Sequence, residues 1–272
     1  MKLYISADME GVACVSDRAE VDKAEAAEYA PAPARMTAEV AAACDGGFAA
    51  GAGEIVVRDA HWTGRNLDAE RLVAPEGRSL RLVRGWSGHP FSMVQELDAS
   101  FGALAFIGYH SAAGRAGNPL AHTLSSRKFA RIEINEAAAS EFLVFGYAAA
   151  IVNVPVRFLA GDAALCEEAA GQVEGIVTVA TMEGRGPSIV SLTPAESVRQ
   201  IREGVARAVR GQAGGVLALP PEFHVRATFT TAAEAYRRSF YPGAVLGSDI
   251  DVVFESRDYF DVLRFLGFMA LG

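Results

Sequence analysis

Short apolar runs alternate along this chain with longer segments whose apolar residues have helical spacing, and this alternation most constrains the fold. Three runs predict buried strands, at residues 3–7, 54–58 and 103–108. Residues 36–51, between the first two runs, are rich in alanine and predict a helix. Strand–helix–strand alternation predicts a three-layer α/β fold, with helices on both faces of the sheet and chemistry at the carboxyl ends of its strands.

The rest of the chain predicts further helices and strands. A helix at residues 140–150 precedes a strand at 154–160. Thr193, Pro194 and Glu196 have capping-box spacing and predict a helix that runs to about Arg210. Residues 223–229 alternate apolar and polar, which predicts a half-buried strand, and residues 258–270 present one apolar helical face. We therefore expect a smaller C-terminal α/β portion.

A length of 272 residues fits one large domain or two small ones. We expect a metal-binding catalytic α/β region over residues 1–165 and a C-terminal α/β portion over residues 166–272, which completes the pocket or mediates assembly. The boundary is soft, near residues 160–190. No low-complexity linker marks it, so one continuous domain stays open as the alternative.

Charge, cysteine content and hydropathy limit the partners and the cellular location that we expect for this chain. The chain has 25 Lys and Arg against 33 Asp and Glu, a formal charge of −8, and we find no basic patch, so nucleic acid is not expected. Cys14, Cys44 and Cys166 form no CxxC pair and predict reduced thiols in a cytoplasmic protein. No apolar run reaches the roughly 18–20 residues of a membrane helix, and Asp8 interrupts any secretory signal.

Acidic and histidine side chains stand at the ends of the three predicted strands. Asp8 and Glu10 project to one side if the first strand stays extended, and two like charges at close range need a cation or a shared proton. By the same alternation Asp59 and His61 share a face after the second strand, and His110 follows the third. Each feature alone fits a solvated strand end or a structural histidine. Their repetition at three strand ends favours a metal site.

Two more candidates follow in the chain. His122 lies in the loop-like stretch 114–126, where it could reach a substrate. Glu141 stands at a predicted helix start, where a carboxylate is favoured by the helix dipole in any case. Two histidines and three carboxylates can hold divalent ions, with one carboxylate bridging two metals. Spacing alone therefore predicts a metal-dependent hydrolase.

Several motifs, in order, resemble those of metallopeptidase family M55, the D-aminopeptidases of the dipeptide-permease operon type. They are SADMEG at residues 6–11, DAH at 59–61, PFSMV at 90–94 with LD at 97–98, GYH at 108–110, and IN at 134–135 followed by Glu141. The resemblance covers roughly residues 1–165 and is weaker beyond.

Carried over residue by residue, the resemblance implies two zinc ions, with Asp8 as the bridging carboxylate and His122 at the position of the family's catalytic histidine. The implied ligands are Asp8, Glu10, His61, His110 and Glu141. His122 is a general acid/base or an oxyanion stabiliser, and a nucleophilic role stays open.

The resemblance also implies an activity and an assembly. Members of the family release N-terminal residues, typically D-amino acids, from short peptides through a water activated by two zinc ions. They form ring-shaped homo-oligomers, notably stacked pentamers, so a decamer is one expected arrangement. The chain departs from the family pattern at Trp62, which is bulky beside His61, and in the spacing of 12 between His110 and His122. These departures concern the shape of the pocket and hence the substrate.

Three questions stay open at this point. The chain could be an amidase or esterase that acts on a non-peptide small molecule with the same metals. It could bind metal without catalysis. The preference for D- or L-amino acids is also undetermined.

Overall fold

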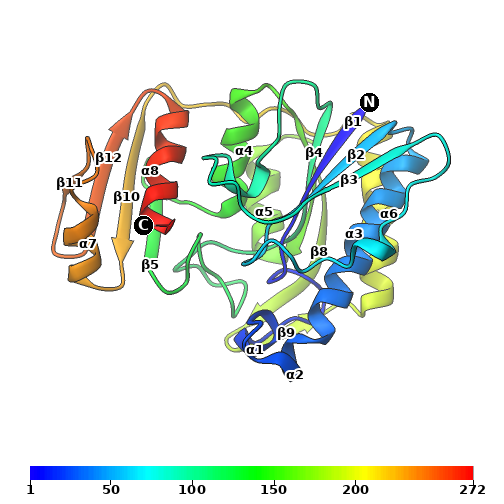
Figure 1. Cartoon of the computed structure of the whole chain (residues 1–272), viewed down its shortest axis with the longest axis horizontal. Helices are drawn as coiled ribbons and strands as arrows, with labels where there is room; N and C mark the ends of the chain where they lie inside the picture. The colour runs from blue at the N-terminus through cyan, green and yellow to red at the C-terminus, as the bar shows by residue number, and fades with distance from the viewer. Residues whose placement is uncertain (272) are drawn as a thin grey trace.

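A computed structural model describes residues 1–271, and a seven-stranded sheet forms its centre (Figure 1). In sheet order the strands are β3 (Ser79–Val83), β2 (Glu54–Asp59), β1 (Lys2–Ala7), β4 (Ala103–Tyr109), β7 (Val156–Asp162), β8 (Val177–Arg185) and β9 (Ser188–Ser191). All neighbours pair in parallel except β8 and β9. The chain moves outward from β1 through β2 to β3 and then returns to the other side of β1 as β4, so the strand order reverses between β1 and β4.

The central strands are buried on both faces. All seven residues of β4 are buried, as are the residues of β1 after Lys2. Parallel strands covered by helices on both sides are near-continuous apolar runs, which is why the sequence pattern locates them well.

Helices cover both faces of this sheet. α3 (Pro31–Ala49) and α6 (Pro194–Arg210) pack on one face, and α4 (Glu141–Ile151) and α5 (Ala163–Gln172) on the other. α3 and α6 approach closely at Gly46, where an added Cβ would lie 2.3 Å from the carbonyl oxygen of Arg202. The short helices are α1 (Arg18–Val21) and α2 (Ala26–Tyr29), with 3₁₀ turns η1 (Ala69–Arg71) and η2 (Ser92–Val94).

A second, antiparallel sheet lies at the end of the molecule away from α3 and α6 (Figure 1). Its order is β11 (Val245–Leu246), β12 (Asp251–Ser256), β10 (Phe223–Phe229), β5 (Phe129–Ile134) and β6 (Ala137–Ala138). α7 (Ala232–Arg238) and α8 (Tyr259–Leu271) pack against it. α8 also packs against α4, where the Tyr259 hydroxyl donates to the Val144 carbonyl at 2.9 Å. α4 therefore joins the two sheets.

The predicted α/β class, with helices on both faces of the sheet, is confirmed. The two sheets interleave along the chain. β5 and β6 precede residue 165 and belong to the small sheet. β8 and β9 follow residue 165 and belong to the large sheet, on which α6 packs. The division into residues 1–165 and 166–272 stays a prediction. Within residues 1–271, every helix is too short or too polar to cross a bilayer.

Candidate metal centre

The carboxyl ends of β2, β1 and β4 meet at one edge of the large sheet. Asp8 directly follows β1, His61 comes two residues after β2, and His110 directly follows β4. In open α/β sheets a crevice forms at this edge where the strand order reverses. The topology thus places three ligand-type side chains at the position where such folds bind ligands.

Two glycines allow the loop after β1 to lie against β4. The Gly11 amide donates to the Gly108 carbonyl at 2.8 Å. A Cβ on Gly11 would lie 1.9 Å from the Tyr109 carbonyl oxygen, and one on Gly108, whose φ is +70°, would lie 2.2 Å from that of Asp8. Any larger residue at these positions would push Glu10 away from the strand ends.

Asp8 and Glu10 converge on His61, although β1 ends at Ala7 and strand alternation does not govern their direction. Asp8 Oδ1 and Glu10 Oε2 each lie 3.1 Å from His61 Nδ1. Asp8 Oδ2 lies 3.5 Å from His110 Nε2. The two oxygens of Asp8 therefore face two different histidines.

Glu141 reaches the same cluster from the first residue of α4. Its N-cap Ser140 accepts a hydrogen bond from the Leu143 amide at 3.1 Å, which fixes the helix start. Glu141 Oε2 lies 3.6 Å from His110 Nε2, and Glu141 Oε1 accepts from the Leu124 amide at 2.7 Å. The helix start thus supplies the third buried carboxylate.

Backbone carbonyls orient all three histidines. His61 Nε2 lies 2.9 Å from the Val21 carbonyl, His110 Nδ1 lies 3.0 Å from that of Ser111, and His122 Nδ1 lies 3.0 Å from that of Leu120. A carbonyl oxygen accepts hydrogen bonds and cannot donate, so these nitrogens carry the proton. In a neutral ring the other nitrogen then has a lone pair free to ligate a metal ion, and a ring N–H held by a carbonyl is usual among histidine metal ligands.

Several polar atoms in the cluster are buried without a hydrogen-bond partner among the described residues. They are His110 Nε2, Glu141 Oε2 and Glu10 Oε2, the last of which has only its ion-pair contact with His61 Nδ1 at 3.1 Å. Buried polar atoms are almost always satisfied by protein, water or an ion. The groups Asp8, Glu10, His110 and His110, His122, Glu141 each bring one ligand atom per residue within 4.8 Å of the others. The donor set therefore fits a divalent cation.

The electrostatics of the cluster also favour a positive charge between its carboxylates. Burial and the charge of Glu10 raise the pKa of Asp8 well above its ordinary value. Burial opposes the ionisation of Glu10, but the charge of the adjacent His61 lowers the pKa of Glu10 well below its ordinary value. Burial likewise disfavours charged His110, yet the carboxylates of Glu141 and Glu10 raise its pKa to about 9. Positive charge is thus strongly favoured between these carboxylates.

His122 stands beside the cluster on the predicted loop. Its ring stacks on that of His110 with centroids 4.5 Å apart, and its Nε2 lies 4.0 Å from Glu141 Oε1. Thr123 anchors the loop, because its hydroxyl donates to the Ala139 carbonyl at 2.8 Å and accepts from the Ala113 amide at 3.1 Å. His122 is only partly buried and lines the cavity described next.

A cavity of about 840 Å³ opens over the cluster. Asp8, Glu10, His61, His122 and Glu141 contribute to its lining, and so do both exposed tryptophans, Trp62 and Trp86. Its apolar wall includes Met93, Leu124, Val144, Phe145, Leu263 and Leu266. The last two come from α8, so the C-terminal helix contributes to this wall. This volume is in the range of ligand sites for small molecules and short peptides.

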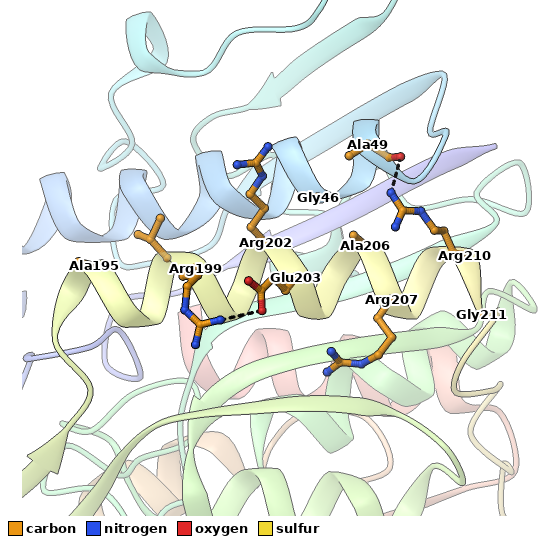
Figure 2. A pocket seen from close by; sticks show the side chains of 11 residues that line it. Gly46, Ala49, Ala195, Arg199, Arg202, Glu203, Ala206, Arg207, Arg210 and Gly211 are labelled. Atoms are coloured by element: carbon orange, nitrogen blue, oxygen red, sulfur yellow. Dashed lines mark hydrogen bonds and ion pairs between the residues drawn. The ribbon is translucent and has the colours of Figure 1, made fainter.

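A second hollow, between α3 and α6, has different chemistry (Figure 2). Arg199 is paired with Glu203, and Arg210 donates to the Ala49 carbonyl. Arg202 and Arg207 extend to different sides of α6. The charged groups of this hollow do not converge on a common point, whereas the carboxylates and histidines at the strand ends do. We therefore assign the candidate metal centre to the strand ends.

Some residues that shape the centre carry no clear signal in the sequence. Asp162 accepts from both the amide and the hydroxyl of Ser111 at 2.6 Å, and it caps α5 as well. Asn118 Nδ2 donates to the Glu10 carbonyl at 2.9 Å. Asp59, which shares a motif with His61, instead accepts from the amides of Asn66 and Leu67 and shapes the loop behind His61. The one local signal for Asp162 is its residue type, since aspartate is favoured at a helix N-cap.

A buried cluster of carboxylates and histidines that opens into a cavity at the strand ends of an α/β sheet is typical of metal-dependent hydrolases. Comparison with known proteins narrows the class. The model of the M55 peptidases, described as D-aminopeptidase, matches residues 1–268. A D-aminopeptidase of Bacillus subtilis (strain 168) is 30% identical over 269 residues, which cover 97% of this chain and 94% of that protein.

A solved structure agrees with these matches. The zinc-dependent D-aminopeptidase DppA from Bacillus subtilis, described as a self-compartmentalizing protease, superposes with a TM-score of 0.89 at 28% identity, covering 99% of this chain and 96% of that one. This chain belongs to the M55 D-aminopeptidase family, and it is a hydrolase of the metal-dependent aminopeptidase class. The resemblance found in the sequence is confirmed, and the family match extends well beyond residue 165.

Proposed function

We propose that this chain is a zinc aminopeptidase that removes N-terminal D-amino acids from short peptides. Two zinc ions bind between the five clustered residues, and His122 is the catalytic side chain. The proposed ligands are Asp8, Glu10, His61, His110 and Glu141. The zinc dependence of the related DppA structure supports this choice of metal.

One observation carries the proposal. Asp8 directs one carboxylate oxygen toward His61 and the other toward His110, at 3.1 and 3.5 Å. A carboxylate that faces two histidines in this way suits a bridging role. Glu10 lies closest to His61 and Glu141 lies close to His110, so residues from several elements would hold the metal.

The chemistry follows from what surrounds the proposed metals. Zinc ions at this place supply Lewis acidity to the scissile carbonyl and to a water. The backbone bonds of His61 and His110 hold their free nitrogens toward the centre and keep the ligand geometry before substrate arrives. The apolar wall of the cavity excludes water from the rest of the substrate.

His122 is placed to move a proton. Because its Nδ1–H is held by the Leu120 carbonyl, its Nε2 can accept a proton on the cavity side and return it to the leaving amine. Stabilisation of the oxyanion by the same nitrogen is the alternative role. Glu141 Oε1 lies 4.0 Å from this nitrogen.

We also propose that the chain forms a ring-shaped homo-oligomer in the cytoplasm. α7, the segment after it and β11 expose Tyr236, Phe240 and Val245, each more than 60% accessible, and the equally exposed Phe268 of α8 also lines the cavity. Large exposed apolar patches on soluble proteins mark interaction sites. A second copy of this chain is the proposed occupant, since the related structure is described as self-compartmentalizing.

The test is the release of alanine from matched D-Ala and L-Ala p-nitroanilides and tripeptides by the zinc-loaded protein. We expect faster release from the D-series, its loss in His110→Ala, and its retention in His224→Ala, a change at an exposed histidine. Hydrolysis confined to non-peptide amides or esters would indicate an amidase. Bound zinc without hydrolysis of any substrate would indicate a non-catalytic metal protein.

A further inference from the structure

The mouth of the cavity carries exposed arginines that the hydrolysis does not use. Arg18 comes from α1, and Arg127 comes from the segment that follows His122. Both line the same cavity as the buried carboxylates Asp8, Glu10 and Glu141. Positive side chains therefore stand at the rim, while the negative ones lie on the floor.

Arg127 has N–H donors that are available to a ligand. Its side chain is 69% exposed and forms one long ion pair, in which Nη2 lies 3.7 Å from Oδ2 of Asp22, another lining residue, so this contact occupies none of its N–H groups in a hydrogen bond. Its Cζ lies 6.0 Å from the centre of the Trp62 ring, a cation–π contact that holds the guanidinium beside the cavity mouth. A guanidinium has five N–H donors in a planar fork that matches a carboxylate.

Arg18 lies next to the same segment. Its Nη1 donates to the hydroxyl of Ser126, the neighbour of Arg127, at 3.2 Å. Because Ser126 and Arg127 are adjacent, both guanidiniums lie along one stretch of the cavity lining. The third arginine of the rim, Arg264, is already paired with Asp261. Arg18 and Arg127 are thus the pair suited to an anionic ligand.

The distance to the metal centre limits the length of the ligand. Trp62 directly follows the proposed ligand His61, and Arg127 contacts the Trp62 ring. Arg127 is thus linked to the centre through the single residue Trp62, and we take a ligand of two or three extended residues, at roughly 3.3–3.6 Å each, as the matching length.

We propose that Arg18 and Arg127 bind the C-terminal carboxylate of a di- or tripeptide, and that Trp62 packs against its last residue. This inference rests on the proposed aminopeptidase function and names its substrate class, peptides with a free carboxylate. The rim then selects for length, because in a longer chain the carboxylate passes beyond the two guanidiniums.

The test compares kcat/KM for Ala-Gly-Gly and its C-terminal amide, with the alanine enantiomer that the protein releases faster. We expect the wild-type protein to favour the free acid by roughly 10- to 100-fold, mainly through KM, as one or two charge-assisted hydrogen bonds predict. Arg18→Gln combined with Arg127→Gln should remove this preference, with a larger fall in kcat/KM for the free acid than for the amide. Arg257→Gln, at an exposed arginine away from the cavity lining, should keep it.

Two results would overturn the inference while leaving the proposed function in place. One is equal efficiency of the wild-type protein on acid and amide. The other is an unchanged preference in the double variant. Hydrolysis of neither peptide by the zinc-loaded wild type would instead refute the proposed function, and the inference with it.

Discussion

The buried carboxyl of Glu39 predicts how the free energy of unfolding changes with pH, and the size of the change follows from its pKa. This carboxyl is buried between α3 and α6, where Oε1 accepts from the Ala13 amide at 3.0 Å and the Ser197 hydroxyl at 2.7 Å. Oε2 lacks a hydrogen-bond partner among the described residues. Burial raises the pKa of Glu39 from 4.5 to about 7, despite these two hydrogen bonds.

The sign follows from the raised pKa of the folded state. Below about pH 4.5 the carboxyl is protonated in both states, and its contribution to stability is fully present. As the pH rises toward 7 the unfolded chain ionises first, and the contribution is lost. At about 1.4 kcal/mol per pKa unit, the loss is roughly 3 kcal/mol. Glu39→Gln keeps an acceptor for both donors and does not titrate, so it should avoid the loss.

The assay is urea unfolding of both proteins at pH 5 and pH 8, at fixed zinc concentration. We expect the free energy of unfolding of Glu39→Gln, relative to wild type, to rise by roughly 2–3 kcal/mol between the two pH values. Glu174→Gln, at an exposed glutamate, is the control and should show no such change. An equal difference between Glu39→Gln and wild type at both pH values would refute the reasoning.

Three further predictions concern the site and its supporting loops. His122→Ala should lower kcat by roughly 10²- to 10⁴-fold with zinc content unchanged; loss of zinc, measured by elemental analysis, would identify it as a ligand instead. Removal of zinc by a chelator should lower Tm, because free zinc at about 1,000 times its Kd stabilises the folded protein by roughly 4 kcal/mol per site. A Tm that changes with neither chelator nor added zinc would contradict the metal site. Gly11→Ala should cost at least roughly 3 kcal/mol by urea unfolding, since its Cβ would lie 1.9 Å from the Tyr109 carbonyl oxygen. Gly171→Ala, with open space around it, should be neutral or stabilising, and equal effects of the two changes would argue against the close approach.

The elements that the sequence predicts best are those whose local pattern is dictated by burial. β1 and β4 are covered on both faces, and their runs of apolar residues show it. α6 begins where Thr193 accepts from the Glu196 amide and Pro194 occupies the first turn, as the capping pattern predicts. β10 has the predicted bounds because one face packs on the core and the other is exposed.

Pairings between distant segments could not be predicted in this way. β5 and β6 are short and partly exposed, and β5 pairs with β10, far along the chain, with Ile134 opposite Val225. No local pattern encodes such a partner. The interleaving of the two sheets was therefore out of reach of sequence reasoning.

The residues of the candidate site also differ in how well the local sequence predicts them. Asp8, His61 and His110 follow from the rule that parallel strands end at one edge of a sheet. Glu141 depended on family resemblance, because a carboxylate at a helix start is common without any site. The Val21 carbonyl that orients His61 is a backbone group, and it leaves no mark in the sequence.

The most direct test of the central claim is the rate of D-alanine release as zinc is titrated into metal-free protein. We predict no activity without zinc, a rise with added metal, and a plateau at two equivalents per chain. Full activity in the absence of metal, or none at any zinc concentration, would contradict the proposed centre of Asp8, Glu10, His61, His110 and Glu141.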